Sequence, residues 1–416
     1  MSALGPAARG PLEGIVVVDL TRALSGPRAT WLLAGLGATV VKIEDPKVGD
    51  SARLNPPYVG ANGLSLSRRD ESDMTLAILN RSPGKHSVTL DLKKPGALDV
   101  FFDLVRRADV VVENFTAGTA DRLGVGYQAA RGANERIVYC SISGFGQDSD
   151  TGVRAMDTVI QALSGLMMTN GGAGDPPIRV GIPIADNVAP LFGVIGILAA
   201  LRRRDQTGRG QYVDVSMLGA MTSLVATEDW EAMEQLGQPI RTGPTLPRLV
   251  PFGLFPCRDG YVAIVAPQDK MAHDLFLAIG RPDLLDDPRF STRDGRVRDP
   301  RTVERAIEAW TAQRTVDEVV EVLEAGRVGV APVRTQAEAL NDPRVVERGE
   351  TRPVTHPDLG EVPGIRTSGV PIKFSDDTTG FAFPARRLGE DNDAVYGDLL
   401  GYSAERLAEL RRSGVI

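Results

Sequence analysis

The chain has few of the residues on which metal-dependent and cysteine-dependent enzymes are built. Its 416 residues include three histidines and two cysteines. His86, His273 and His356 each stand apart from any cysteine or carboxylate at metal-ligand spacing, and Cys140 and Cys257 form no C-x-x-C pair. We therefore expect no zinc, haem or iron-sulfur site and no Cys-His catalysis. In an enzyme of this composition, carboxylates are the leading candidates for the nucleophile or the acid-base group.

Nucleotide-binding, nucleic-acid and membrane signals are also scarce. No G-x-G-x-x-G follows a strand-like run and G-x-x-x-x-G-K-[ST] is absent, which argues against NAD- and ATP-dependent chemistry. The formal net charge is -7, aromatic residues make up 5%, and no long basic cluster occurs, so we expect no nucleic-acid partner. The N-terminus lacks a secretory apolar region, and the apolar run at 188–201 is too short to span a bilayer. We expect that run to be a buried helix, with no membrane association and a cytoplasmic location.

The first half of the chain alternates β-branched runs with helical patterns. Pro27 can open a helix that stops at Gly37, and 96–107 carries apolar residues at helical spacing. This rhythm predicts an α/β fold with a parallel sheet. The expected strands are 15–20, 39–44, 87–92, 108–113 and 136–141.

Loops that follow parallel strands carry the functional residues of such sheets. Here these loops are 21–27, 45–53, 114–122 and 143–148. In the third, a strand ends in Asn114-Phe115, and Arg122 lies about two helical turns further on. The arrangement suits an ordinary helix start with a solvated arginine. It equally suits a ring and an amide for a ligand, with a cation for phosphate.

The stretch 156–186 holds three acids, Asp157, Asp175 and Asp186, in otherwise nearly uncharged, glycine-rich surroundings. Glycines precede Asp175 and Pro176-Pro177 follow it. By composition alone this is an ordinary surface turn. A loop that is bare on one side and stiffened on the other also lets a bulky ligand approach closely.

Motifs throughout the chain together resemble a known family, the class III coenzyme A transferases, which are grouped with the CaiB/BaiF proteins. The similarity extends from about Gly10 to the end, and the number, order and spacing of the motifs carry it. The acyl substrate depends on loops in which relatives differ. The matching stretches are D-L-T-R-A-L-S-G-P (19–27), G-A-T-V-V-K-I-E-D-P-K-V-G-D (37–50), S-V-T-L-D-L-K (87–93), A-D-V-V-V-E-N-F (108–115), S-G-F-G-Q (143–147), Q-A-L-S-G-L-M (161–167), T-G-R-G-Q (207–211) and L-G-E (388–390).

The resemblance implies transfer of CoA from an acyl-CoA donor to a carboxylic acid acceptor through an aspartyl mixed anhydride. Coenzyme A thioester is then a substrate, and no prosthetic group or metal is needed. Asp175 matches the nucleophile loop, although relatives commonly read D-G-P-P where this chain reads G-D-P-P. The backbones of Gly171, Gly172 and Gly174 are the expected donors to the oxyanion.

The resemblance also points to the residues that bind CoA. Leucine and phenylalanine side chains would flank the adenine, Arg122 would pair with a phosphate, and the main chain at 143–144 would meet the pantetheine amides. The eight residues are Leu24, Ser25, Leu90, Asn114, Phe115, Arg122, Ser143 and Gly144.

The implied architecture is a large Rossmann-like parallel-sheet domain and a smaller α+β domain. We expect the large domain to comprise 1–205 and the returning segment 336–416, with a linker and the small domain at 206–335. The small domain is expected to carry 255–266 and a helix at 303–324. Family members form homodimers whose chains are interlinked like rings, so an interlinked homodimer is expected.

Three other functions stay open. An α-methylacyl-CoA racemase of the same fold uses a histidine and an aspartate, and Met156 occupies the position of that histidine. Asp186 matches the racemase aspartate but is widespread in transferases too, so it does not discriminate, and Asp157 fits a helix cap or a supporting acid. A CoA-thioester binding protein without transfer activity and a thioesterase are the other two alternatives.

Overall fold

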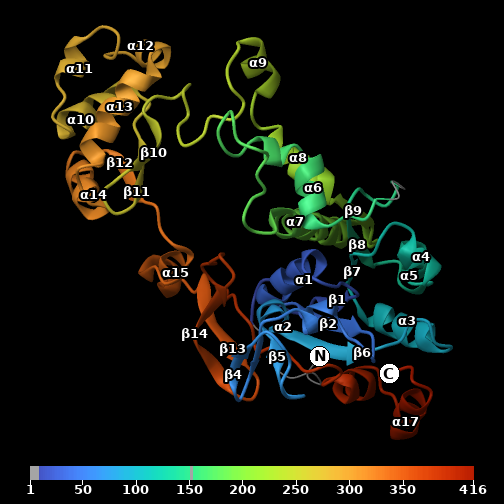
Figure 1. Ribbon diagram of the computed structural model, residues 1–416. Coiled ribbons are helices and arrows are strands. Elements are labelled where there is room, and N and C mark those ends of the chain that lie inside the picture. Colours follow the sequence, from blue (N-terminus) through green and yellow to red (C-terminus); the bar gives the residue numbers. More distant parts are fainter. Residues whose placement is uncertain (1–8, 150–152) are drawn as a thin grey trace. The chain divides into compact units, whose positions relative to one another are not determined.

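The computed structural model describes residues 9–149 and 153–416, which form two compact units (Figure 1). The predicted nucleophile stretch is divided between them, because Asp157 and Asp186 belong to the first unit and Asp175 to the second. The first unit comprises Met1–Ser164, Val180–Val225 and Leu340–Ile416, and the second comprises Gly165–Arg179 and Ala226–Ala339.

Six parallel strands form the centre of the first unit, in the order β6-β2-β1-β7-β8-β9. This sheet confirms the predicted α/β class, and the first five strands in that order overlap the β-branched runs expected from the sequence. Valine suits these runs because its branched side chain packs well on a pleated surface that is covered on both faces. The strands are β1 (Val16–Asp19), β2 (Thr39–Glu44), β6 (Lys85–Thr89), β7 (Val110–Glu113), β8 (Val138–Ser143) and β9 (Tyr212–Ser216).

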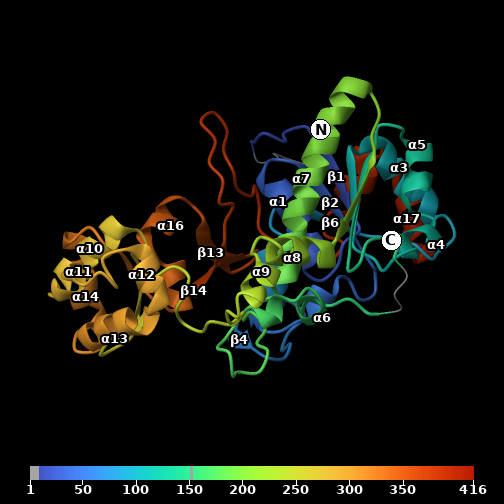
Figure 2. The same cartoon turned by 90° about the horizontal axis from the view of Figure 1, so that it is seen from above.

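Helices cover both faces of the sheet, α1 and α7 on one side and α3, α5 and α17 on the other (Figure 2). Alternate residues of β1, such as Val16 and Val18, share one buried core with Phe101 of α3 and Leu407 of α17. The helices of this unit are α1 (Ser25–Gly35), α2 (Leu76–Arg81), α3 (Ala97–Arg107), α4 (Thr119–Arg122), α5 (Tyr127–Ala133), α6 (Asp157–Leu163), α7 (Ile184–Thr207), α8 (Met217–Val225), α16 (Pro343–Glu347) and α17 (Ala404–Arg412).

Asp19, Lys42 and Lys85 are among the charged side chains of the central strands that are buried. Asp19 of β1 pairs in register with Lys42 of β2, and the carboxylate of Asp19 lies 3.1 Å from Nζ of Lys85 in β6. Burial alone would raise the pKa of Asp19, but Lys85 and Lys42 outweigh it and lower that pKa to about 2. Lys42 also donates to the carbonyl of Thr21 at 2.7 Å, so the buried charges hold the chain where it leaves β1.

The chain returns to the first unit at its C-terminal end. Asp391 accepts a hydrogen bond from the N–H of Ser87 at 2.9 Å, and Asn392 accepts one from Thr89 at 2.8 Å, so the returning segment binds β6. A π-helix, Asp393–Leu399, and α17 follow and bury Tyr396 and Leu407.

Helix α7 differs from its prediction. The 188–201 run was expected to be too short to span a bilayer, but the helix has 24 residues, because it continues through polar residues at both ends of the run. By length and composition alone the helix is long and apolar enough to cross a membrane, a test that buried core helices also pass. The helix packs against α1, α8, β8 and β9 of the same unit. Leu191, Ile195 and Leu198 leave apolar surface exposed along it.

Two small antiparallel sheets complete the first unit. They pack around α2, whose Ile78 shares a buried core with Val59 and Val354. This packing fixes the position of Arg81 at the end of α2. The sheet β4-β3-β5 and the hairpin β13-β14 consist of β3 (Tyr58–Gly60), β4 (Gly63–Ser65), β5 (Met74–Thr75), β13 (Thr351–His356) and β14 (Gly360–Ser368).

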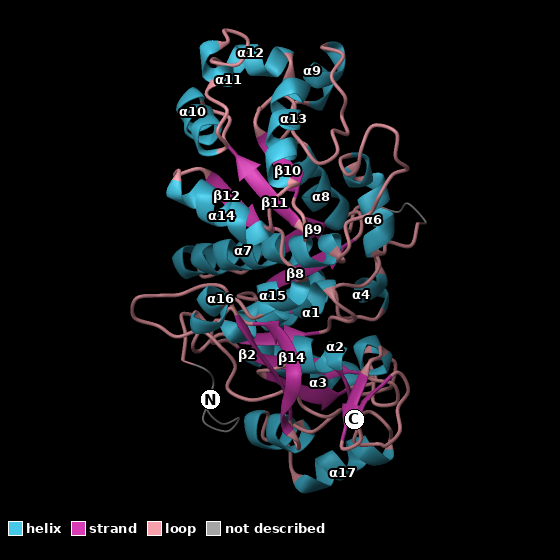
Figure 3. Cartoon of the chain, turned by 60° about the vertical axis from the view of Figure 1, so that its left-hand side comes forward, coloured by secondary structure: helices cyan, strands magenta, loops and turns pink. Residues whose placement is uncertain are grey.

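The second unit is built on the antiparallel sheet β10-β11-β12, magenta in Figure 3. The prediction of one helix at 303–324 was wrong, because two helices occupy this stretch. Thr315 starts the second one, since its side chain and that of Glu318 form a capping box. The elements are α9 (Trp230–Gln235), β10 (Phe252–Pro256), β11 (Tyr261–Val265), α10 (Asp269–Ala278), α11 (Asp283–Asp286), α12 (Arg293–Arg298), α13 (Pro300–Thr311), α14 (Val316–Ala325) and β12 (Gly329–Pro332), with α15 (Gln336–Leu340) at the return to the first unit.

Candidate active site

A cavity of about 410 Å³ lies in the first unit where β1, β7 and β8 end. The loops that follow these strands supply much of its wall, because the carboxyl ends of parallel strands meet at one edge of the sheet. The start of α6, the first turn of α7 and Met217 of α8 supply the rest. Three of the four loops expected to be functional therefore meet at this cavity.

Seven of the eight residues predicted to bind CoA lie around two cavities. Leu90 lines a second cavity of about 230 Å³, which shares Phe115 with the first. Arg122 lines neither: it is exposed on α4 and donates to Oγ1 of Thr119 at 2.7 Å. The predicted residues on the larger cavity are Leu24, Ser25, Asn114, Phe115, Ser143 and Gly144.

Helix α1 begins at this larger cavity without a side-chain cap. Its N-cap residue, Leu24, makes no capping hydrogen bond, and the first N–H groups of a helix have no partner within the helix. Ser25 is only 4% exposed, and among the described residues its Oγ has no hydrogen-bond partner. A helix start and a buried hydroxyl in this state favour a negatively charged or carbonyl oxygen in the cavity.

Two aspartates lie at the wall of the cavity, and the side chain of one binds the backbone of the other. Asp157, the first residue of α6, accepts hydrogen bonds from the N–H groups of Ala185 at 2.8 Å and Asp186 at 3.3 Å. Gln161 donates to its second oxygen at 2.7 Å. Asp157 was expected to cap a helix, and it binds the first turn of α7. Because its oxygens are occupied by these donors, Asp157 holds Asp186 in place.

Asp186 is half-buried, and its pKa is the one most relevant to chemistry in the cavity. Burial raises this pKa, the negative charge of Asp157 raises it further, and the positive charge of Arg81 lowers it. The net result is a pKa of about 6. A carboxylate with this pKa is ionised at neutral pH but less hydrated than a surface acid, and it can therefore act as a nucleophile or a base.

Glu113 lies at the end of β7, next to the cavity loop, and is 1% exposed. It accepts hydrogen bonds from Oγ of Ser141 and, at 2.6 Å, from the N–H of Phe115. Burial raises the pKa of Glu113 to about 7 even though these bonds oppose the shift. A carboxyl group that titrates near neutrality thus holds the backbone of a predicted CoA-binding residue.

Asp175 has different surroundings in the second unit. Its side chain is exposed and accepts a hydrogen bond from the N–H of Gly172 at 2.7 Å. Arg241, which is 7% exposed, donates to the carbonyls of Asn170, Asp175 and Pro176 and so holds the loop around Asp175 in place. One of the glycine N–H groups expected to hold an oxyanion is therefore bonded to Asp175 itself.

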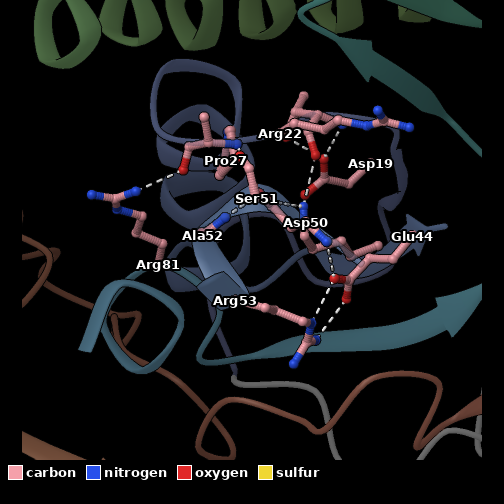
Figure 4. Close-up of polar contacts among 12 residues, drawn as sticks. Asp19, Arg22, Pro27, Glu44, Asp50, Ser51, Ala52, Arg53 and Arg81 are labelled. Atoms are coloured by element: carbon pink, nitrogen blue, oxygen red, sulfur yellow. Dashed lines mark hydrogen bonds and ion pairs between the residues drawn. The ribbon is translucent and has the colours of Figure 1, made fainter. Parts of the chain in front are cut away.

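Two residues that the sequence reading did not single out support the cavity. Asp50, buried after β2, and Arg81, at the end of α2, both bind the loop that follows β1 (Figure 4). Only a weak signal in the sequence pointed to Asp50. It lies in the loop after a strand that contains a lysine, and a lysine that is buried needs a charged partner. Nothing in the sequence distinguished Arg81.

Comparison with known proteins agrees with the fold and identifies the family. The model of a family described as CoA-transferase family III matches residues 12–392. The chain therefore belongs to CoA-transferase family III, which confirms the resemblance seen in its motifs. Its relatives carry names of enzymes that transfer CoA, and the chain is accordingly a CoA-transferase.

Individual relatives align over almost the whole chain. Succinyl-CoA:mesaconate CoA-transferase of Haloarcula hispanica is 37% identical over 88% of this chain and 91% of its own length. Formyl-CoA:oxalate CoA-transferase of Streptomyces avermitilis is 36% identical over 97% of this chain and 99% of its own. The crystal structure of a CaiB/BaiF family protein from Brucella suis matches with a TM-score of 0.80 at 30% identity, over 94% of this chain and 100% of that one.

Proposed function

We propose that this CoA-transferase moves CoA between carboxylic acids through an acyl anhydride on Asp186. A carboxylate oxygen of Asp186 attacks the donor thioester carbonyl, the C–S bond breaks, and CoA leaves as a thiolate. The thiolate then attacks the Asp186 carbonyl and releases the donor acid. The acceptor carboxylate displaces CoA from Asp186, and a final attack by the thiolate on the new acyl carbonyl forms the product thioester and frees the carboxylate.

The observation that carries this proposal is the placement of Asp186. It lines the same cavity as Ser25, Asn114 and Gly144, which the family resemblance predicts to bind CoA. Its carboxylate is partly desolvated, whereas that of Asp175 is exposed and bonded to its own loop. Asp175 stays a prediction from the sequence, and the experiments below separate the two carboxylates.

The start of α1 is the proposed site for charge that develops during attack. The unpartnered Oγ of Ser25 and the uncapped helix start would stabilise the oxyanion of a thioester carbonyl. The rest of CoA would extend over Asn114 and Phe115 towards Leu90, with its amides near Ser143 and Gly144. Arg122 would have to leave Thr119 to reach a phosphate.

The proposed acceptors are dicarboxylic acids. This rests on the names of relatives, which pair succinyl-CoA with mesaconate in one case and formyl-CoA with oxalate in another. Arg154 lines the cavity and is exposed, so its guanidinium is free to meet a second carboxylate in the substrate. A monocarboxylate of the same length would lack that contact.

The proposed assembly is a cytoplasmic homodimer. Apolar side chains at 37% to 62% exposure follow one another along α7 at Leu191, Ile195 and Leu198, at a spacing that places them on one face of the helix. A second copy that covers this stripe would remove the apolar surface from water. Interlinking of the two chains stays an expectation from the family.

Racemase chemistry finds less support in this cavity. Met156 lines it and is 70% exposed, and a thioether offers no base for the second proton transfer. Proton exchange at the α-carbon in deuterated water, without exchange between acids, would nevertheless establish racemisation.

Mass spectrometry tests the proposed transfer directly. The protein is incubated with succinyl-CoA or acetyl-CoA and a panel of isotopically labelled mono- and dicarboxylates, and new acyl-CoA masses are followed over time. The proposal requires steady formation of a labelled acyl-CoA. Release of free CoA without labelled product would show a thioesterase, and binding without turnover would show a binding protein.

A further inference from the structure

Ala23 has an unusual backbone conformation directly before the cavity. Its φ is +66°, in the left-handed region where a Cβ crowds the following carbonyl. Arg327 is the other non-glycine residue with positive φ in the described part of the chain, and it follows the end of α14, where left-handed residues are common. Ala23 follows a strand, so its conformation must be held by other contacts.

Side chains from three separate elements bind the backbone of Arg22 and Ala23. Asn114 accepts from the N–H of Arg22 at 2.8 Å and donates to its carbonyl at 2.9 Å. Asp50 accepts from the N–H of Ala23 at 2.9 Å, and Arg81 donates to the carbonyl of Ala23 at 2.8 Å. Asp50 and Arg81 reach the loop from different elements (Figure 4). All four backbone polar groups of two successive residues thus have side-chain partners.

Asp50 is itself firmly held. It is 2% exposed, accepts from the N–H of Ala52 at 2.9 Å and lies 2.9 Å from Nζ of Lys42. Its own N–H donates to Glu44 at 2.9 Å. A carboxylate with this many partners has one position available, so the N–H of Ala23 is fixed with it.

We propose that Asp50 and Arg81 are positioning residues that hold Ala23 in its left-handed conformation and so fix Leu24 and Ser25 at the cavity. Leu24 and Ser25 follow Ala23 directly and begin α1. The first turn of α1 packs closely against Thr21, because a Cβ added at Gly26 would come within 2.4 Å of Cβ of Thr21. The start of the helix therefore has little space in which to shift. The kinetic consequence rests on the proposed function, but the conformational consequence does not.

A direct electrostatic role for Arg81 is the competing explanation. Its positive charge acts on Asp186 as well as on the carbonyl of Ala23. Glycine at position 23 separates the two roles. Glycine adopts positive φ without a steric cost, so it should keep the loop in place when Arg81 is lost, but it cannot replace a charge.

The experiment compares Arg81→Met, Arg81→Lys, Ala23→Gly and the double variant of Arg81→Met with Ala23→Gly against the unmodified enzyme. Arg366→Met is the matched control, since Arg366 donates to a backbone carbonyl, that of Thr351, at 3.0 Å in a hairpin that contributes nothing to the cavity wall. Deuterium uptake of peptides covering 21–26, affinity for CoA by calorimetry, and kcat and KM for acyl exchange are measured. Asp50→Ala should behave like Arg81→Met, but it also leaves Lys42 without its carboxylate, so Arg81 carries the test.

Arg81→Met should speed deuterium uptake at 21–26 and lower kcat about tenfold or more, as expected when a reacting group is misplaced. Ala23→Gly alone should change little, the double variant should recover most of the lost kcat, and Arg366→Met should match the unmodified enzyme. Unchanged uptake in Arg81→Met would overturn the proposal. Failure of Ala23→Gly to restore kcat, together with recovery in Arg81→Lys, would assign Arg81 a direct charge role instead.

The two proposals fail separately. An unmodified enzyme that performs no acyl exchange would remove the proposed function, while deuterium uptake and CoA affinity would still decide whether the Ala23 loop is held by Asp50 and Arg81. Faster uptake with unchanged kcat, in an enzyme that does exchange acids, would show that the contacts stabilise the loop without serving catalysis, and would also overturn the positioning role.

Discussion

Asp175 and Asp186 lie eleven positions apart in one glycine-rich stretch, but the fold gives them opposite surroundings. Asp186 lies in the first turn of a long helix of the first unit, lines a cavity and has a pKa raised to about 6 by burial and by Asp157. Asp175 sits in an exposed turn of the second unit, with its carboxylate bonded to Gly172. Local sequence favoured Asp175, because glycine and proline draw attention to a loop. Tertiary placement favours Asp186.

The comparison shows how a carboxylate that faces a cavity differs from a carboxylate that shapes a turn. A turn aspartate gains stability by accepting backbone N–H groups, and these bonds reduce its availability for attack. Next to Asp186, the carboxylate that binds backbone groups is Asp157, which accepts hydrogen bonds from the N–H groups of Ala185 and Asp186. The carboxylate of Asp186 is thereby left to the cavity.

The largest expected effect comes from removing the two carboxylates in turn. Asp186→Asn should lower the rate of acyl exchange by about a thousandfold or more, as loss of a nucleophile does, while CoA binding is retained. Asp175→Asn should leave the rate within about threefold of the unmodified enzyme, since its side chain bonds only its own loop. Steady-state exchange between two acids, with calorimetry of CoA binding as the control, distinguishes them. The reverse pattern would restore Asp175 as the nucleophile.

The pH dependence should follow Asp186. Its raised pKa means that the carboxylate takes up a proton below about pH 6, and the protonated acid is not nucleophilic. We expect kcat/KM to be level above that pH and to fall about tenfold per pH unit below it. Arg81→Met should move the midpoint upward, because Arg81 lowers this pKa while burial and Asp157 raise it. A rate that is unchanged down to pH 5 would contradict the assignment.

Arg241 tests whether the turn in the second unit has a mainly structural role. Arg241→Met removes the donors to three carbonyls, so the thermal midpoint should fall by an amount that corresponds to about 2 kcal/mol. Below the transition, acyl exchange should stay within about threefold of the unmodified rate. Arg248→Met, which removes an exposed arginine paired with Glu228 in the same unit, is the control. Loss of activity in a folded Arg241→Met variant would show that this loop takes part in the reaction.

The smallest expected effect is on stability through Glu113. Its pKa in the folded protein, about 7, lies above its ordinary value of 4.5, so the folded state binds the proton more tightly than the unfolded state. The stability of the unmodified protein should therefore fall as pH rises from about 4.5 to about 7. Glu113→Gln lacks this dependence and should gain about 1–2 kcal/mol relative to the unmodified protein between pH 5 and pH 8.

A matched substitution in the second unit sharpens this test. Asp283 is exposed, and its bond to Arg281 lowers its pKa, which is the opposite direction. Asp283→Asn should show no stability gain between pH 5 and pH 8. Denaturant unfolding at several pH values measures both variants. A pH-independent difference between Glu113→Gln and the unmodified protein would contradict the shifted pKa.

Much of the central sheet could be predicted because its cause is local. The runs around Val17, Val40 and Val111 have the β-branched composition of strands covered on both faces, and three of the four loops expected to follow such strands line the cavity. The break between α13 and α14 also has a local cause, the capping box of Thr315 and Glu318. The prediction missed it because apolar residues continue at helical spacing on both sides of the break.

The cavity itself could not be predicted, because its walls meet only through tertiary packing. Arg81 comes from a short helix held by two small sheets, and Asp50 from a loop joined to the buried lysine of β2. The best signal for the cavity in the sequence was the presence of two charged residues, Asp19 and Lys42, within strands. A buried charge requires a partner, and their register across β1 and β2 supplies it.

Covalent trapping of the acyl intermediate tests the central claim most directly. The enzyme is incubated with an acyl-CoA, the anhydride is captured with hydroxylamine, and the resulting aspartyl hydroxamate is located by mass spectrometry of peptides. Asp186→Asn serves as the blank for its own peptide. We predict the mass change on the peptide that contains Asp186 and none on the peptide that contains Asp175. A hydroxamate on Asp175, with Asp186 unmodified, would contradict the assignment.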